Sequence, residues 1–229
     1  MPKRAILVAL LAAALALVAG CGDSGTVTVT VTDATTTADT SSAGTVTAAP
    51  AIEADLELRL PPPKSIPSLR PGTATVQPTA QKLVDSLYST GDAAKPAAVV
   101  RLDAAGYETG VLRDQRGANP RRGLTLFRSY VYRLRDQAAA QHEVDDSVDE
   151  VKRDSTASSV DVEVPDIPGA RGLLLKTKSP TIDAEVLYVT WVAGRDVYGI
   201  QSFTRAGSKL YRDETIDLAQ TLYLAWKEG

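Results

Sequence analysis

The chain offers few residues for nucleophilic, acid–base or metal chemistry. Among its 229 residues it has one histidine, His142, and one cysteine, Cys21. His142 lies four residues before Asp146 on a predicted helix, and that spacing could hold a metal ion weakly. A serine–histidine hydrolase would need the same histidine. His142 falls roughly opposite the apolar stripe of the helix, so we expect it to face water on a solvated acidic surface, with no metal bound.

The signatures of other common enzymes are missing from the sequence. It contains no Gly-x-Ser-x-Gly turn, His-Glu-x-x-His helix, Ser-x-x-Lys motif or glycine-rich phosphate loop, and we expect no cofactor. Carboxylates are plentiful, so a hydrolase that uses a carboxylate pair stays an alternative. No two of them stand out by their positions in the sequence as that pair. We expect Trp191 and Trp226 to be core residues and not a platform for stacking sugars.

Cys21 ends an N-terminal pattern that is typical of export. Lys3 and Arg4 precede a continuous apolar stretch of 14 residues, Ala5–Val18. As a helix this stretch would rise about 21 Å, which is short of the roughly 30 Å hydrocarbon core of a bilayer. A basic start, a short apolar stretch and small residues before a cleavage point predict a secretory signal peptide.

The ending Leu17-Val18-Ala19-Gly20-Cys21 resembles the lipobox of bacterial lipoproteins. In that family the cysteine thiol is alkylated by a diacylglyceryl group and the peptide is cut just before it, which is here between Gly20 and Cys21. The resemblance implies an extracytoplasmic protein held on the outer leaflet of the cell membrane by lipidated Cys21. Two long acyl chains would supply on the order of 20 kcal/mol of membrane affinity, enough for stable residence.

Charge and cysteine content exclude several classes of protein. The formal net charge is −3 at pH 7, and loss of Lys3 and Arg4 with the signal peptide would make the chain more acidic. Nucleic-acid-binding domains are usually basic, so we expect no nucleic-acid partner. With Cys21 lipidated, no thiol would remain for a disulfide, a cysteine metal site or a thiol nucleophile.

Composition divides the chain into a signal peptide (1–20), a lipidated Thr/Ala/Pro-rich tether (21–78) and one domain (79–229). The tether is poor in large apolar residues at first and rich in proline later, which favours a disordered spacer. Its segment Ile52–Leu60 alternates apolar and polar residues. This segment could form an edge strand on the domain or on a partner.

Within the domain, apolar periodicity predicts an α+β fold, an antiparallel β-sheet with helices packed on one face. Caps and breakers place the element boundaries, for example Thr79 before the first helix and Gly106 after the second. Gly194 and Arg195 form a plausible hairpin turn. The predicted helices are 79–88, 96–102, 136–153 and 208–227, and the predicted strands are 107–116, 124–134, 160–164, 171–178, 184–192 and 196–204.

The element order is similar to that of the PsbP/Mog1-like domains of actinobacterial lipoproteins. The resemblance covers roughly residues 79–229. It rests on this order, on the loop Val162–Ala170, and on the hairpin Tyr188–Tyr198 that a C-terminal helix follows. It implies a non-catalytic binding or accessory domain and transfers no functional residue.

Charge is unevenly distributed along the domain. Seven arginines lie between residues 113 and 135, where only Asp114 opposes them, and an acidic segment follows from Asp136 to Asp166. The two segments could simply be solvated surfaces that attract each other. Alternatively, the basic hairpin could bind an anionic envelope component or an acidic partner, because guanidinium groups suit phosphate and carboxylate. The candidate anion-binding residues are Arg113, Arg116, Arg121, Arg122 and Arg128.

The sequence thus predicts a membrane-anchored lipoprotein with a non-enzymatic domain that binds a ligand or a partner protein of the envelope. The alternatives are an envelope hydrolase with a carboxylate pair, and a structural protein-interaction module in which Leu56–Leu60 docks a partner strand.

We expect Cys21→Ser to release the protein from the membrane or to leave the precursor uncut, because the acceptor for the diacylglyceryl group is lost. Membrane fractionation and the mass of the N-terminal peptide measure both outcomes. A processed Cys21→Ser protein that stays in the membrane like the wild type would refute the lipobox prediction.

Overall fold

The computed structural model describes residues 49–63, 69–88, 92–117, 124–154, 158–178, 183–205 and 212–228. Gly20 and Cys21, and Arg121 and Arg122, lie outside these ranges, so the lipidation site and the tip of the basic hairpin stay predictions. Within these ranges, no helix combines the length and hydrophobicity that a membrane crossing requires.

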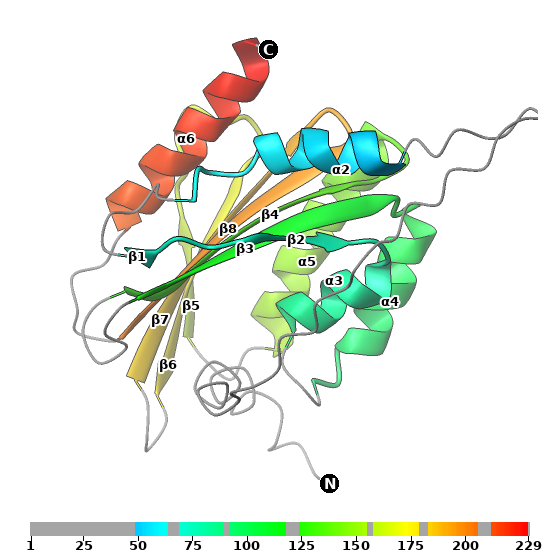
Figure 1. Ribbon diagram of the computed structural model, residues 1–229. Helices are drawn as coiled ribbons and strands as arrows, with labels where there is room; N and C mark the ends of the chain where they lie inside the picture. Colours follow the sequence, from blue (N-terminus) through cyan, green and yellow to red (C-terminus); the bar gives the residue numbers. More distant parts are fainter. Residues whose placement is uncertain are drawn as a thin grey trace, which may run out of the picture.

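A single antiparallel sheet forms the centre of the molecule (Figure 1). Its strand order is β1-β3-β4-β8-β7-β6-β5, and β2 also pairs with β3. The antiparallel α+β class predicted from the sequence is therefore confirmed. The strands are β1 (Leu69–Arg70), β2 (Ala74–Gln77), β3 (Thr109–Gly117), β4 (Leu124–Arg133), β5 (Ser158–Val162), β6 (Arg171–Lys178), β7 (Asp183–Ala193) and β8 (Asp196–Arg205).

Local signals in the sequence explain where the helices begin and end. The Thr79 side chain accepts a hydrogen bond from the backbone nitrogen of Lys82, and the Asp136 side chain accepts one from that of Ala139, as N-caps do. Gly106, at φ +72°, follows the second predicted helix as expected. The helices are α2 (Ala49–Leu58), α3 (Ala80–Leu87), α4 (Lys95–Ala104), α5 (Gln137–Asp154) and α6 (Arg212–Glu228).

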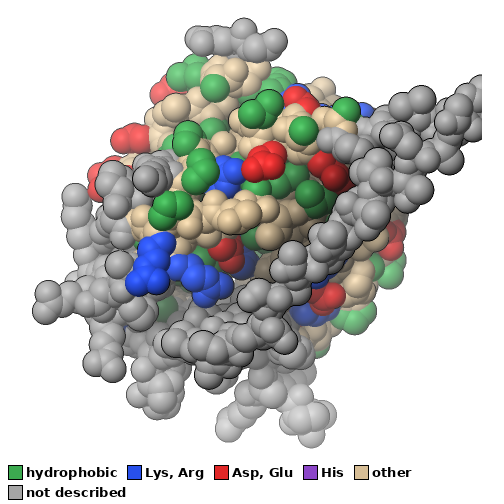
Figure 2. Space-filling model, in the orientation of Figure 1, with side chains coloured by type: hydrophobic (Ala, Val, Ile, Leu, Met, Phe, Trp, Pro, Cys, Tyr) green, Lys and Arg blue, Asp and Glu red, His purple; other side chains and the backbone are tan. Residues whose placement is uncertain are grey.

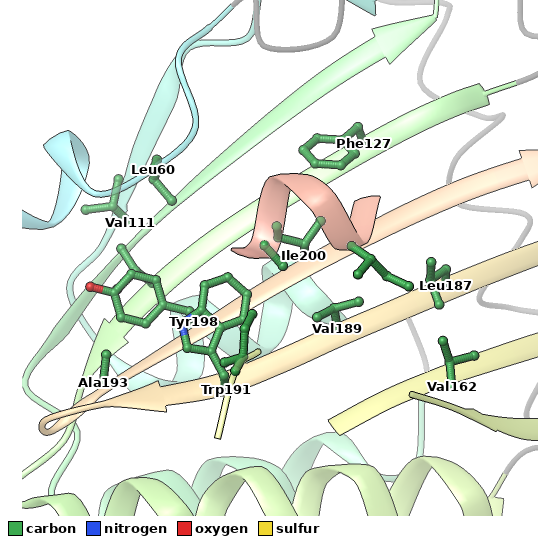
Figure 3. Close-up of a cluster of buried hydrophobic side chains, with 14 of the residues drawn as sticks. Leu60, Val111, Phe127, Val162, Leu187, Val189, Trp191, Ala193, Tyr198 and Ile200 are labelled. Carbon is green, nitrogen blue, oxygen red and sulfur yellow. The ribbon is translucent and has the colours of Figure 1, made fainter. Parts of the chain in front are cut away.

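Helices cover both faces of the sheet, which corrects the expectation that they pack on one face. Helices α2 and α6 pack on one face, over a core that includes Phe127, Trp191 and Ile200 (Figure 3). Helices α3, α4 and α5 pack on the other face, against Tyr130 and Tyr132. Because side chains alternate along a strand, a central strand that is apolar on both sides needs helical cover on both sides.

The segment Ile52–Leu60 is neither tether nor strand. Residues 49–58 form α2, and Leu56 and Leu60 are buried in the core together with Leu69. The alternation also contains a spacing of four: Ile52 and Leu56 lie on one face of α2, and Leu60 follows two residues after the helix ends. The domain therefore includes residues 49–63, which the prediction placed in the tether before residue 79.

Helix α6 differs in detail from its prediction. Ile216 and Ala219 are its buried apolar residues, whereas Leu218, Leu222 and Trp226 are only partly buried. Trp226 packs against Tyr223, with ring centroids 5.9 Å apart. The prediction that Trp191 is a core residue is confirmed, because its side chain is buried and stacks on Tyr198.

We expect Leu56→Ala to destabilise the fold by about 2–5 kcal/mol, because it leaves a cavity in a packed core. Leu58→Ala is the matched control, because it makes the same substitution on the same helix. The Leu58 side chain is 86% exposed, whereas that of Leu56 is 0% exposed. The control should change the free energy of unfolding by less than about 0.5 kcal/mol. Denaturant unfolding curves measure both, and equal effects would show that α2 does not belong to the core.

Candidate ligand-binding site

A cavity of about 140 Å³ lies between the sheet and helices α3, α4 and α5. Most of its lining is aliphatic or aromatic, with Leu83 and Val84 from α3, Val148 from α5, and Leu173 and Val186 from the sheet. All of these residues are buried, and all but Val148 belong to the core clusters on the α3–α5 face. A largely apolar cavity with a few polar groups is the usual form of a small-molecule site.

Four tyrosines bring aromatic surface to the cavity: Tyr88, Tyr130, Tyr132 and Tyr188. The rings of Tyr130 and Tyr132 stack with centroids 6.1 Å apart. Gly199 faces Tyr130 across the strand pair, and a Cβ at this position would lie only 2.0 Å from the tyrosine ring. A glycine is therefore needed for that ring to lie against the sheet.

The tyrosine hydroxyls are neutral hydrogen-bonding groups at physiological pH. Burial raises the pKa of each of the four tyrosines above its ordinary value, because a phenolate loses hydration in an apolar surrounding. The cavity thus presents hydroxyl groups that donate and accept hydrogen bonds but carry no charge.

One arginine joins two carboxylates at the cavity. Arg101 Nε and Nη2 donate to the two oxygens of Glu143, at 2.7 and 3.1 Å, and its Nη1 donates to Glu150 Oε2 at 2.6 Å. The Tyr88 hydroxyl donates to the same oxygen of Glu150 at 3.3 Å. Glu143 and Glu150 are seven residues apart on α5, which is two helical turns, so one face of α5 presents both.

Burial raises the pKa of Glu143 above its ordinary value, although the hydrogen bonds and the charge of Arg101 oppose this shift. Both carboxylates are held by the same guanidinium. Neither is therefore a free acid or base of the kind that a glycosidase uses. The arrangement ties α4 to α5 and gives the cavity one charged side.

Gln201 of β8 supplies an unusual polar atom. Its side chain lines the cavity and is only 4% exposed, yet its Oε1 has no hydrogen-bond partner among the described residues. An unpaired buried acceptor costs about 1–3 kcal/mol, and protein interiors rarely leave one unpaired. A ligand with a hydrogen-bond donor would satisfy it.

Two of the seven arginines hold α2 on the sheet. Arg113 is buried and donates to the backbone oxygen of Pro61 and, at 3.1 Å, to Glu57. Arg133 makes two hydrogen bonds to Asp196, of 2.7 and 2.9 Å, and a longer one to Asp55. Arg113, one of the predicted anion-binding residues, is thus occupied inside the fold.

Of the other two described anion-binding candidates, Arg128 is paired within the fold and Arg116 is exposed. Arg128 lies opposite Asp114 in register, makes two hydrogen bonds to it and donates to the backbone oxygen of Ser86. Arg116 is exposed and pairs in register with Arg70 of β1. Figure 2 shows a basic patch beside β1. Of the described candidates, Arg116 alone keeps a side chain available to an anion.

The structure also places the histidine considered above. His142 is exposed on α5, as predicted, and no group of histidine, cysteine and carboxylate side chains suited to a metal ion occurs in the described part of the chain. The sequence reasoning missed Arg101, Glu143, Glu150 and Gln201. The seven-residue spacing of the glutamates was a readable signal, but their common arginine lies more than 40 residues away.

The comparisons with known proteins bear mainly on the fold. No protein-family model and no curated protein matches the chain, so the PsbP/Mog1-like resemblance stays a prediction. The chain is similar to the crystal structure of the extracellular domain of PknH from Mycobacterium tuberculosis, with a TM-score of 0.53 and 12% identity. The likeness covers 97% of that domain and 77% of this chain, so it includes residues before position 79.

We expect Arg128→Ala to destabilise the fold by about 2 kcal/mol, because it leaves Asp114 without its charged partner. Arg116→Ala is the control. Its side chain is 51% exposed and lies 3.9 Å from Asp114, so its loss should cost less than about 0.5 kcal/mol. Thermal or denaturant unfolding compares them, and a neutral Arg128→Ala would mean that Arg128 remains free to bind anions.

Proposed function

We propose that the chain is a lipid-anchored extracytoplasmic protein whose domain binds a small ligand in the α3–α5 cavity. The observation that carries this proposal is the cavity itself, which combines apolar walls, neutral tyrosine hydroxyls and an unpaired acceptor on Gln201. The N-terminal pattern that ends at Cys21 supports the membrane anchor. The fold likeness to an extracellular domain is compatible with this location.

A non-enzymatic role fits the way in which the charged groups are held. General acid–base chemistry needs a group that can gain or lose a proton at the substrate. Arg101 occupies both Glu143 and Glu150 with short hydrogen bonds. Such a cluster stabilises one arrangement of α4 and α5 and suits recognition better than proton transfer.

The envelope hydrolase remains a second candidate, because Glu143 and Glu150, together with Asp92, do line one cavity. For that role, substrate would have to draw Arg101 away from one of them. Turnover of an envelope glycoside or ester by the purified chain, together with its loss in Glu150→Gln, would favour this candidate over the binding proposal.

The protein-interaction alternative loses the strand on which it was based. Leu56, the first residue of the proposed docking segment Leu56–Leu60, is buried in α2. The exposed pair Arg70 and Arg116 keeps two guanidinium groups at the surface, where an anionic envelope component would bind. This basic patch is separate from the residues that line the cavity.

We expect Val151→Trp to abolish co-purification of a ligand, because Val151 lines the cavity and a larger side chain would fill it. The cost in stability should stay within about 1–3 kcal/mol. Val100→Trp on α4 is the matched control, because Val100 is 68% exposed and does not line the cavity.

Native mass spectrometry of the full chain purified from its own envelope tests this expectation. The wild type and Val100→Trp should carry the same additional mass, and Val151→Trp should lack it. A bare wild-type protein, or the same mass on Val151→Trp, would contradict binding in the cavity.

A further inference from the structure

The cavity has a charge balance that selects among ligands. Arg101 is its cationic lining residue, and the carboxylates of Glu143, Glu150 and Asp92 also line it. Arg101 uses all three of its nitrogens to bind Glu143 and Glu150. One positive charge therefore faces two negative charges within this cluster alone. An incoming anion would meet excess negative charge and a guanidinium whose three nitrogens already donate to carboxylates.

Two acceptor atoms of the cavity are open, beside tyrosine hydroxyls that can donate as well as accept. Gln201 Oε1 has no partner among the described residues. Both hydrogen bonds to Glu150 end on its Oε2, from Arg101 and from Tyr88, and Oε1 of Glu150 accepts none from the part of the chain that the structure describes. Two acceptors of this kind call for a ligand that donates hydrogen bonds.

The size and the walls of the cavity limit the rest of the ligand. An engineered cavity of about 150 Å³ in another protein holds one benzene molecule, and this cavity measures about 140 Å³. The ligand portion that enters is thus about the size of a six-membered ring or a short alkyl chain. The tyrosine rings of the cavity favour a cationic ligand, because the faces of their π-systems attract cations.

From these observations we propose that the cavity binds a small organic cation, an ammonium group on an apolar body. This inference rests on the proposed function and makes it more specific. The ammonium would donate to Glu150 and Gln201, and the apolar body would pack among the aliphatic and tyrosine side chains.

Four probes of nearly equal size test the proposal: benzylamine, benzyl alcohol, toluene and benzoate. The protein is the full-length chain carrying Cys21→Ser, and binding is followed by calorimetry or ligand-observed NMR. Benzylamine should bind at least about tenfold more tightly than benzyl alcohol, as expected for a charge-assisted hydrogen bond, and benzoate should bind most weakly.

Two variants separate the contributions of the acceptors. Glu150→Gln should weaken the binding of benzylamine about tenfold and leave that of benzyl alcohol nearly unchanged, because the substitution removes the charge and keeps an acceptor. Gln201→Leu should weaken the binding of both benzylamine and benzyl alcohol, which donate hydrogen bonds. It should leave the affinity for toluene unchanged or higher. Gln141→Leu is the matched control, because Gln141 is exposed on α5 and does not line the cavity. Thermal unfolding verifies that each variant folds.

The proposal and the function on which it rests fail in different ways. Equal affinity for benzylamine and toluene, or tighter binding of benzoate, would overturn the cationic ligand and leave a ligand-binding cavity in place. Absence of any benzylamine binding at millimolar concentration would overturn it as well. Native mass spectrometry of Val151→Trp then decides independently whether the cavity binds a ligand at all.

Discussion

The structure depends on three central strands, β4, β8 and β7, that are buried on both faces. Their side chains alternate between two cores, so that Val131 and Tyr198 face α2 and α6 whereas Tyr130 and Tyr132 face α3, α4 and α5. Both faces must be covered, and this requirement draws α2 into the domain. The two faces are filled differently, because the large tyrosines and Gly199 on the α3–α5 side accompany a cavity there.

Ion pairs between the helices and the sheet, and between two of the helices, support this two-sided arrangement. Asp55 and Glu57 from α2 meet Arg133 and Arg113 from the sheet, and Asp196 joins the first pair. Partly buried pairs of this kind contribute little net stability, but loss of one partner is costly. They fix the position of α2 over the sheet. At the cavity the same chemistry holds α4 against α5 through Arg101.

Local patterns predicted most elements, and long-range pairing explains what they could not predict. Thr79, Gly106 and the Gly194-Arg195 turn act within a few residues, and the structure confirms all three. The basic hairpin was misleading because a window of residues 113–135 contains only Asp114, whereas the acids that neutralise Arg113 and Arg133 come from residues 55–57 and 196. The cavity likewise combines residues from three helices and four strands. The apolar residues around Leu56 fit both the period of two of a strand and the spacing of four of a helix. Only packing against the sheet face, which the sequence does not show, selects the helix.

The central claim is that the α3–α5 face, and not the α2–α6 face, receives a ligand. Methyl NMR on the full-length chain, labelled at leucine and valine and titrated with benzylamine, tests it most directly. The account predicts that chemical shifts change at Leu83, Val148 and Val186, which line the cavity, and stay constant at Val111 and Leu187 in the opposite core. Changes centred on Val111 and Leu187, or no change at the cavity methyl groups with benzylamine and with toluene alike, would contradict it.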